Sequence, residues 1–201
     1  MHTLLESNQY VRCVLIDFSK AFDTVDHVIL ARKLFCLETP VFITQWIMSF
    51  LTDRNQATKL GFHLSSTLPI NRSIIRCSGI GPLIFIMFAH DLKPLDILNF
   101  LIKYADDGTL LSPENSKTSV EIEMAHIINR ASKNKMTANL LKTVEIAFHK
   151  PNVSHDLLPP VMHSVSRVAV AKLLGVHFRH DLNFSQQVES VVATCIKDSI
   201  Y

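Results

Sequence analysis

Residues 100–111, with the sequence FLIKYADDGTLL, place two short apolar arms around Asp106-Asp107-Gly108. An Asp-Gly pair between such arms is a strong hairpin signal, so we expect a tight turn at Asp107-Gly108 with the acids at its tip. A second apolar run, VRCVLID at residues 11–17, is rich in β-branched side chains and ends in Asp17. It predicts a buried strand. Both predicted strands therefore carry carboxylates where they end.

Helices are expected around these strands. Thr24 or Asp26 can cap a helix after the first strand, and Pro40 opens a second helix. Residues 79–92 are apolar nearly all round, which predicts a central helix buried under other elements. Further elements are predicted at residues 56–78 (short strands and loops), 117–136 and 185–200 (helices), 143–148 (a strand) and 165–178 (a hairpin). Together they predict an α+β fold, an antiparallel sheet with helices packed on one face.

The composition excludes several classes of protein. The 201 residues are 48% hydrophobic and 19% charged, with a mean hydropathy of +0.22, which excludes a disordered tail, a collagen-like repeat and a coiled coil. A net charge of +2 does not by itself indicate a nucleic-acid-binding protein. Four cysteines without a C-x-x-C pair favour a reducing compartment, so we expect the cytoplasm or nucleus. The longest apolar run, residues 79–89, is too short to cross a membrane.

Asp17, Asp106 and Asp107 together predict a metal site. Three carboxylates around one poorly solvated point cannot all ionise cheaply, and a divalent cation removes that repulsion. Oxygen ligands favour Mg²⁺, and two such ions can activate an attacking hydroxyl and stabilise the leaving oxygen in phosphoryl transfer. Taken separately, Asp17 is more often a strand-end or cap residue, and Asp106-Asp107-Gly108 more often a plain turn. The three acids form one site only if their strands are neighbours in the sheet.

Six segments resemble motifs of reverse transcriptases from non-LTR (LINE-type) retrotransposons, in the order in which that family carries them. They are IDFSKAFDTVDH at 16–27, WIMSFLTDRNQ at 46–56, SGIGPLIF at 78–85 with HDL at 90–92, KYADD at 103–107, NLLKT at 139–143 and KLLGV at 172–176. The resemblance covers nearly the whole chain. It implies the palm of an RNA-directed DNA polymerase.

The resemblance also implies catalytic roles for individual residues. Asp17, Phe18, Asp106 and Asp107 would form the site for two Mg²⁺ (or Mn²⁺) ions, at which the 3′-hydroxyl of a primer attacks the α-phosphate of a deoxynucleotide. Lys142 matches the lysine that would protonate the leaving pyrophosphate. The alternative for Lys142 is a solvated surface lysine.

Four further residues would contact the nucleotide by the same resemblance. Phe22 would exclude a ribose 2′-hydroxyl by its bulk, although plain core packing is the alternative. Arg76, Cys77 and Ser78 would lie beside the nascent base pair. Arg76 and Cys77 depart from the family, which has glutamine and glycine there. A cysteine side chain would crowd a ligand that approaches the backbone closely, whereas an arginine could grip phosphate.

Two parts of the chain are expected from the resemblance. Residues 1–150 would be the palm, with the family's fingers missing, and residues 151–201 would be the primer-grip hairpin and the first thumb helix. Leu174, Gly175 and Val176 would form the turn of that hairpin, which supports the primer terminus.

The expected partners are an RNA template, a DNA primer and a deoxynucleotide, and no membrane. Because fingers and thumb supply most of the cationic grip on phosphates in polymerases, we expect this chain alone to bind primer–template weakly, with little or no activity. An alternative function is a non-catalytic, palm-derived module that binds a protein or RNA.

Overall fold

The computed structural model describes residues 2–75, 78–150, 153 and 158–198. The chain folds into two compact units, each assembled from separate segments. Unit 1 comprises Met1–Asp17, Pro94–His126 and Ala138–Tyr201, and unit 2 comprises Phe18–Lys93 and Ile127–Thr137. The division predicted at residue 150 stays a prediction.

A mainly antiparallel sheet joins the two strands that end in acids. Its strand order is β10-β9-β1-β7-β6, and β8 pairs with β1 off this path. The strands are β1 (Tyr10–Ser19), β6 (Phe100–Tyr104), β7 (Asp107–Pro113), β8 (Thr137–Ala138), β9 (Val144–His149) and β10 (Ser166–Arg167). The predicted α+β fold is confirmed. Because β1 and β7 pair directly, the acid-bearing strands are neighbours, as the three-carboxylate hypothesis requires.

The hairpin of β6 and β7 turns earlier than predicted. Tyr104 pairs with Asp107, which leaves Ala105 and Asp106 as the two-residue loop. The predicted turn at Asp107-Gly108 is therefore wrong. Gly108 is paired with Lys103 on one side and Ile16 on the other, so its backbone groups are satisfied by the sheet ladder. This register extends β7 alongside β1 as far as Asp17.

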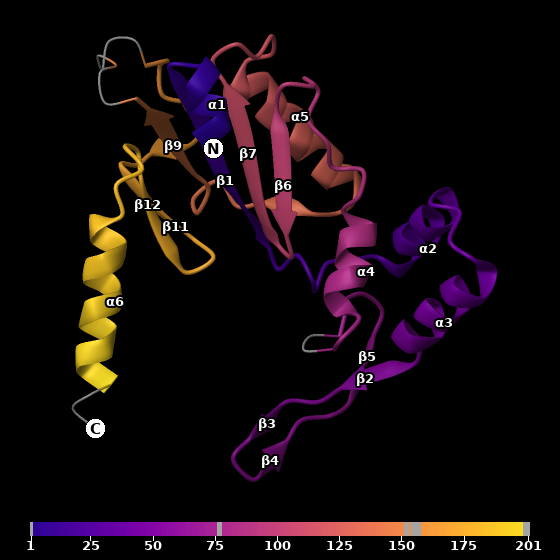
Figure 1. Cartoon of the computed structure of the whole chain (residues 1–201). Helices are drawn as coiled ribbons and strands as arrows, with labels where there is room; N and C mark the ends of the chain where they lie inside the picture. The colour runs from indigo at the N-terminus through magenta and orange to yellow at the C-terminus, as the bar shows by residue number, and fades with distance from the viewer. Residues whose placement is uncertain (1, 76–77, 151–152, 154–157, 199–201) are drawn as a thin grey trace. The chain divides into compact units, whose positions relative to one another are not determined.

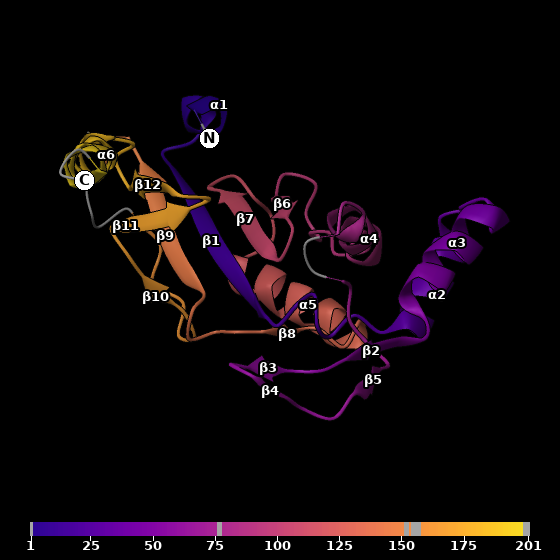
Figure 2. The ribbon, with the colours of Figure 1, turned by 90° about the horizontal axis from the view of Figure 1, so that it is seen from below.

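The two faces of this sheet are covered by different elements. On one face, Val11, Cys13 and Leu111 pack in a core cluster with Ala171 of a second hairpin. That hairpin consists of β11 (Val170–Leu173) and β12 (Val176–Arg179), and burial raises the pKa of the Cys13 thiol to about 12. The first part of helix α5 (Val120–Lys133), which belongs to unit 1 as far as His126, lies on the opposite face (Figures 1 and 2), with Met124 buried. The short helix α1 (His2–Ser7) and the helix α6 (Ser185–Asp198) complete the elements of unit 1.

The helices of unit 2 follow the predicted starts. The carboxylate of Asp26 accepts from the backbone N–H groups of Val28 and Ile29 and so caps α2 (His27–Cys36). Pro40 precedes α3 (Val41–Leu51). The helix α4 (Gly81–Phe88) packs against α2, but its Leu83 and Ile86 are 53% and 54% exposed. The helix is therefore buried on one side only, by residues that include Ile84, Phe85 and Phe88, and the predicted central position holds only in part. None of the described helices combines the length and the hydropathy that crossing a membrane needs.

A two-stranded ribbon follows α3 in unit 2. Its strands are β2 (Arg54–Gln56), β3 (Lys59–Leu60), β4 (His63–Leu64) and β5 (Leu68–Ile70). β2 pairs with β5, and β3 pairs with β4. The expectation of short strands and loops in this part of the sequence is confirmed.

Glu123 of α5 fixes the segment that leads into β6. Its fully buried carboxylate accepts from the backbone N–H groups of Leu95 and Asp96, at 2.8 and 2.7 Å, and from Nδ2 of Asn99 at 2.8 Å. We expect Glu123→Ala to lower the free energy of unfolding by about 2 kcal/mol, because these donors lose a charged acceptor. Urea unfolding followed by circular dichroism measures this loss. Ile122→Ala, on the exposed side of the same helix, is the control, and an equal effect of both variants would contradict the prediction.

Candidate active site

Asp17 and Asp107 lie directly opposite each other in the ladder between β1 and β7. Opposite residues of an antiparallel pair project to the same face, with Cβ atoms about 4.5–5.5 Å apart. The two carboxylates therefore share one face of the sheet. Phe18, the next residue of β1, is buried, and its side chain projects to the other face because neighbouring strand residues alternate.

The backbone of Asp17 is held by the segment before β9. The carbonyl oxygen of Asp17 accepts from the backbone N–H of Asn139 at 2.8 Å. The hydroxyl of Thr143 accepts from the backbone N–H of Asp17 at 3.4 Å and donates to the carbonyl of Asn139 at 2.9 Å. Asn139 and Thr143 are thus positioning residues that the sequence analysis did not single out. The signal was present, because both residues belong to the NLLKT motif at 139–143.

Asp106 occupies the turn next to this pair and is exposed. The preceding Ala105 has a φ of 51°, in the left-handed region that residues with a side chain seldom adopt. A residue held there stores about 1–3 kcal/mol, and such strain gathers at functional sites. The strained turn therefore places Asp106 directly before Asp107, which is the first residue of β7.

The charges of Asp17 and Asp106 act on the Asp107 carboxylate. Burial raises the pKa of the Asp107 carboxyl, and the neighbouring charges of Asp106 and Asp17 raise it further. Within the described residues, none of the three forms an ion pair. Over the same residues, no group of three or more His, Cys, Asp or Glu side chains is gathered closely enough to hold a metal ion. The paired carboxylates still fit Mg²⁺, which usually takes one or two carboxylates together with substrate phosphates.

The predicted nucleotide contacts fall in unit 2. The ring of Phe22 stacks on that of Phe85, with 4.8 Å between centroids and an angle of 17°. Ser78 donates from its hydroxyl to the carbonyl of Ile75 at 2.7 Å. A Cβ at Gly81 would come within 2.9 Å of the Ser78 hydroxyl and 3.1 Å of the carbonyl oxygen of Ile75, so a larger residue there would displace this close turn. Arg76 and Cys77 lie outside the described residues.

The remaining predicted residues lie in two turns of unit 1. Lys142 is exposed in the turn that precedes β9. Leu173 pairs with Val176, so Leu174 and Gly175 form the two-residue loop of the β11–β12 hairpin. Both loop residues have positive φ, 49° and 88°, as in the turns that suit two-residue hairpins. The turn is thus confirmed at Leu174 and Gly175, whereas Val176 begins β12, and contact of these residues with a primer stays a prediction.

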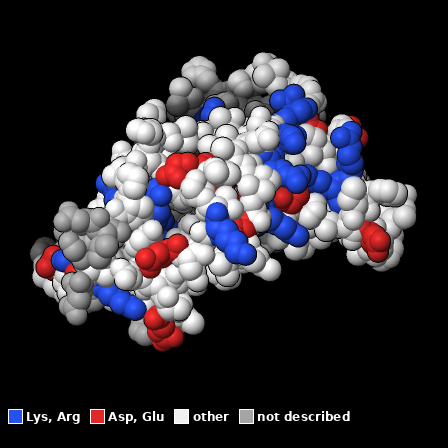
Figure 3. Space-filling view, turned by 90° about the horizontal axis from the view of Figure 1, so that it is seen from above, with Lys and Arg blue, Asp and Glu red and all other residues white. Residues whose placement is uncertain are grey.

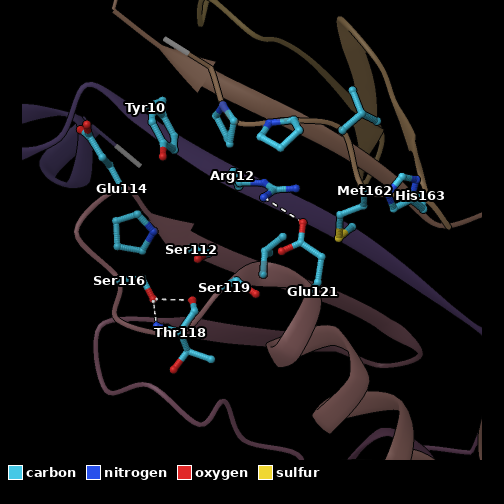
Figure 4. A pocket seen from close by; sticks show the side chains of 15 residues that line it. Tyr10, Arg12, Ser112, Glu114, Ser116, Thr118, Ser119, Glu121, Met162 and His163 are labelled. Atoms are coloured by element: carbon cyan, nitrogen blue, oxygen red, sulfur yellow. Dashed lines mark hydrogen bonds and ion pairs between the residues drawn. The ribbon is translucent and has the colours of Figure 1, made fainter.

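A separate cavity of about 470 Å³ lies in unit 1 and is shown in Figure 4. Its lining includes Arg12, Ser112 and Glu121 but none of the predicted site residues. The side chain of Arg12 reaches into this cavity, where its guanidinium pairs with Glu121 at 3.1 Å (Figure 4). The candidate active site is therefore an open sheet face rather than this cavity.

One family model matches the chain, over residues 1–178, and is described as "Reverse transcriptase (RNA-dependent DNA polymerase)". No match was found among curated proteins.

Several solved telomerase structures share the fold. Telomerase from Candida tropicalis in complex with a TWJ fragment of telomeric RNA has a TM-score of 0.62 at 12% identity, over 92% of this chain and 32% of that one. An apo form of the same enzyme, truncated from its C-terminal domain, has a TM-score of 0.61 at 13% identity, over 92% and 37%. The Candida albicans telomerase has a TM-score of 0.57 at 12% identity, over 86% and 30%. The chain spans about a third of the length of these structures.

Proposed function

Because the chain belongs to the reverse transcriptase (RNA-dependent DNA polymerase) family, we propose that it is the palm of an RNA-directed DNA polymerase from a non-LTR retrotransposon. The pairing of Asp17 with Asp107, next to Asp106, carries the proposal. It brings together acids that lie far apart in the sequence, in the manner that a metal-dependent nucleotidyl transferase needs. The non-LTR origin is supported by the six motifs and their order along the chain.

In this proposal Asp17, Asp106 and Asp107 would hold two divalent metal ions, with Phe18 adjacent. When bound, such ions would activate the primer 3′-hydroxyl and neutralise charge on the phosphate. The protein's part is to hold the carboxylates in place. The sheet ladder fixes Asp17 against Asp107, and the strained turn fixes Asp106. The exposed Lys142 donates a proton to the leaving pyrophosphate.

The contacts with substrate are assigned by the same proposal. Phe22, held against Phe85, excludes the ribose 2′-hydroxyl. By the family resemblance, Arg76, Cys77 and Ser78 would contact the nascent base pair, and residues 174–176 would support the primer end. The partners are an RNA template, a DNA primer and a deoxynucleotide.

The chain by itself has weak or no activity in this proposal. Polymerases hold primer–template largely by cationic side chains on phosphates, whereas this chain has a net charge of only +2. On the face shown in Figure 3, Lys and Arg side chains are interspersed with Asp and Glu. The chain spans about a third of the length of the telomerases that share its fold.

Titration with Mn²⁺, followed by electron paramagnetic resonance, tests the metal site. We expect saturable binding by the parent chain, at least tenfold weaker binding by Asp106→Ala, and no change for Glu189→Ala, which removes an exposed carboxylate from α6. Primer extension on an RNA template should be slow and should stop in Asp106→Ala. The absence of a saturable Mn²⁺ site would favour the non-catalytic module, and rapid extension would contradict the proposed weak activity.

A further inference from the structure

The ribbon of unit 2, residues 54–70, contributes almost nothing to a core. Every residue from 52 to 69 is exposed, and the ribbon strands pair only with one another within the described residues. Figures 1 and 2 show the ribbon extending away from the end of α3 as a thin arm. Because a two-stranded ribbon without packing is marginally stable in water, its exposed side chains are explained better by a partner than by folding.

The ribbon is positively charged and carries no acid. No Asp or Glu occurs between Asp53 and Asp91. Arg54 and Lys59 lie on the ribbon, and Arg72 follows it; none of these cations forms an ion pair within the described residues. A polyanion is therefore the partner whose charge complements this surface.

Arg54 is also held in a fixed position. Its Nε donates to the carbonyl of Phe50 at 2.8 Å, and its guanidinium lies 5.2 Å from the centroid of the Phe50 ring. A guanidinium carries five N–H donors, so four remain for a ligand. The anchoring reduces the entropy that Arg54 would lose on binding a phosphate.

The tip of the ribbon is apolar and includes a fully exposed ring. Gly61, with a φ of +59°, turns the chain, and Phe62 beside it is 105% exposed. Leu64 lies opposite Lys59 in the β3–β4 ladder, so a cation and an apolar side chain share one face. Proteins bind single-stranded nucleic acid by cationic side chains that contact the phosphate backbone and aromatic side chains that stack on the bases.

We propose that residues 54–72 form an arm that binds single-stranded nucleic acid, with Arg54, Lys59 and Arg72 on phosphates and Phe62 stacked on an unpaired base. The proposed function supplies the identity of that strand, an RNA template, whereas the binding itself requires neither the metal site nor catalysis. A protein partner with basic groups is less well matched, because the ribbon offers Arg54 and Lys59, with Arg72 after it, and no acid between Asp53 and Asp91.

Fluorescence anisotropy with a labelled single-stranded RNA of about 15 nucleotides, in EDTA, tests the arm. We expect Arg54→Gln/Lys59→Gln to weaken binding about tenfold and to lower the slope of log K against log[salt] by about 1.4, since each phosphate contact on a single strand contributes about 0.7. Phe62→Ala should weaken binding about tenfold by loss of stacking. Lys93→Gln and Phe35→Ala, which change an exposed lysine and an exposed phenylalanine of unit 2 outside the ribbon, are the matched controls and should bind as the parent does.

Three results would overturn the arm: no RNA binding by the parent chain, equal binding by the ribbon variants and the parent, or self-association of the parent that the same variants abolish. Competition with unlabelled RNA distinguishes a single-stranded from a double-stranded ligand. If the arm binds unpaired bases, single-stranded RNA should displace the labelled RNA better than a duplex does. The outcome is independent of the polymerase proposal. RNA binding that depends on the ribbon, in a chain without a Mn²⁺ site, supports the arm and contradicts the catalytic assignment. A chain that binds Mn²⁺, and whose RNA binding does not change in the ribbon variants, would support the catalytic assignment and contradict the arm.

Discussion

Glu145→Gln is expected to lower the free energy of unfolding by about 3–5 kcal/mol, the largest stability loss predicted for this chain. Glu145 lies on β9 with no exposed surface, and its Oε1 accepts from Nε of Arg12 at 2.5 Å and from Nη2 of Arg167 at 3.0 Å. Glutamine has the same shape but no charge, so two guanidinium groups would remain in unit 1 without a buried counter-charge. Thermal unfolding should show a melting temperature lower by about 6–20 °C.

Two further variants separate charge from shape. Glu121→Gln removes the other carboxylate on Arg12, but that side chain is 48% exposed, so the loss should stay below about 1 kcal/mol. Arg12→Met/Glu145→Leu/Arg167→Met removes the whole network. Since replacing a buried ionic group by apolar residues is often neutral or stabilising, the triple variant should be more stable than Glu145→Gln alone. A triple variant that is less stable than the single one would contradict this account.

The sequence predicted the elements of the fold because their signals are local. An apolar run that ends at Asp17, a cap at Asp26 and a proline at residue 40 are each read within a few positions, and the structure has a strand and two helices there. The buried network around Glu145 has no such signal. Arg12 and Glu145 lie far apart in the sequence, and only the pairing of β1 with β9 shows that they meet.

Register is the part of the site that local patterns could not supply. Asp107-Gly108 is a favourable turn pair, yet the ladder to β1 makes both residues part of a strand. This choice puts Asp107, rather than Asp106, opposite Asp17. The burial of α4 was also overestimated, since an apolar sequence does not show which of its sides a neighbouring helix covers.

Asp107→Asn is expected to abolish most of the stabilisation that Mn²⁺ gives to the folded chain. A ligand at one hundred times its dissociation constant adds about 2.7 kcal/mol, which corresponds to a rise of roughly 5–11 °C in melting temperature. Without metal, the same variant should be more stable than the parent at neutral pH by a few tenths to about 1 kcal/mol, because like charges opposite each other in a ladder destabilise it. Glu189→Gln should change neither quantity.

In the absence of metal, the difference in stability between Asp107→Asn and the parent should grow as the pH rises. The pKa of Asp107 is raised in the folded chain above its ordinary value of 3.8 by burial and by the charges of Asp106 and Asp17. The folded state therefore binds the proton more tightly, and stability falls as the pH rises through the folded pKa. Melts in EDTA should show the parent and Asp107→Asn together at the acid end, with the parent falling behind from about pH 4 upward. A Mn²⁺ response that survives in Asp107→Asn would show that the carboxylates facing each other across β1 and β7 do not bind the ion.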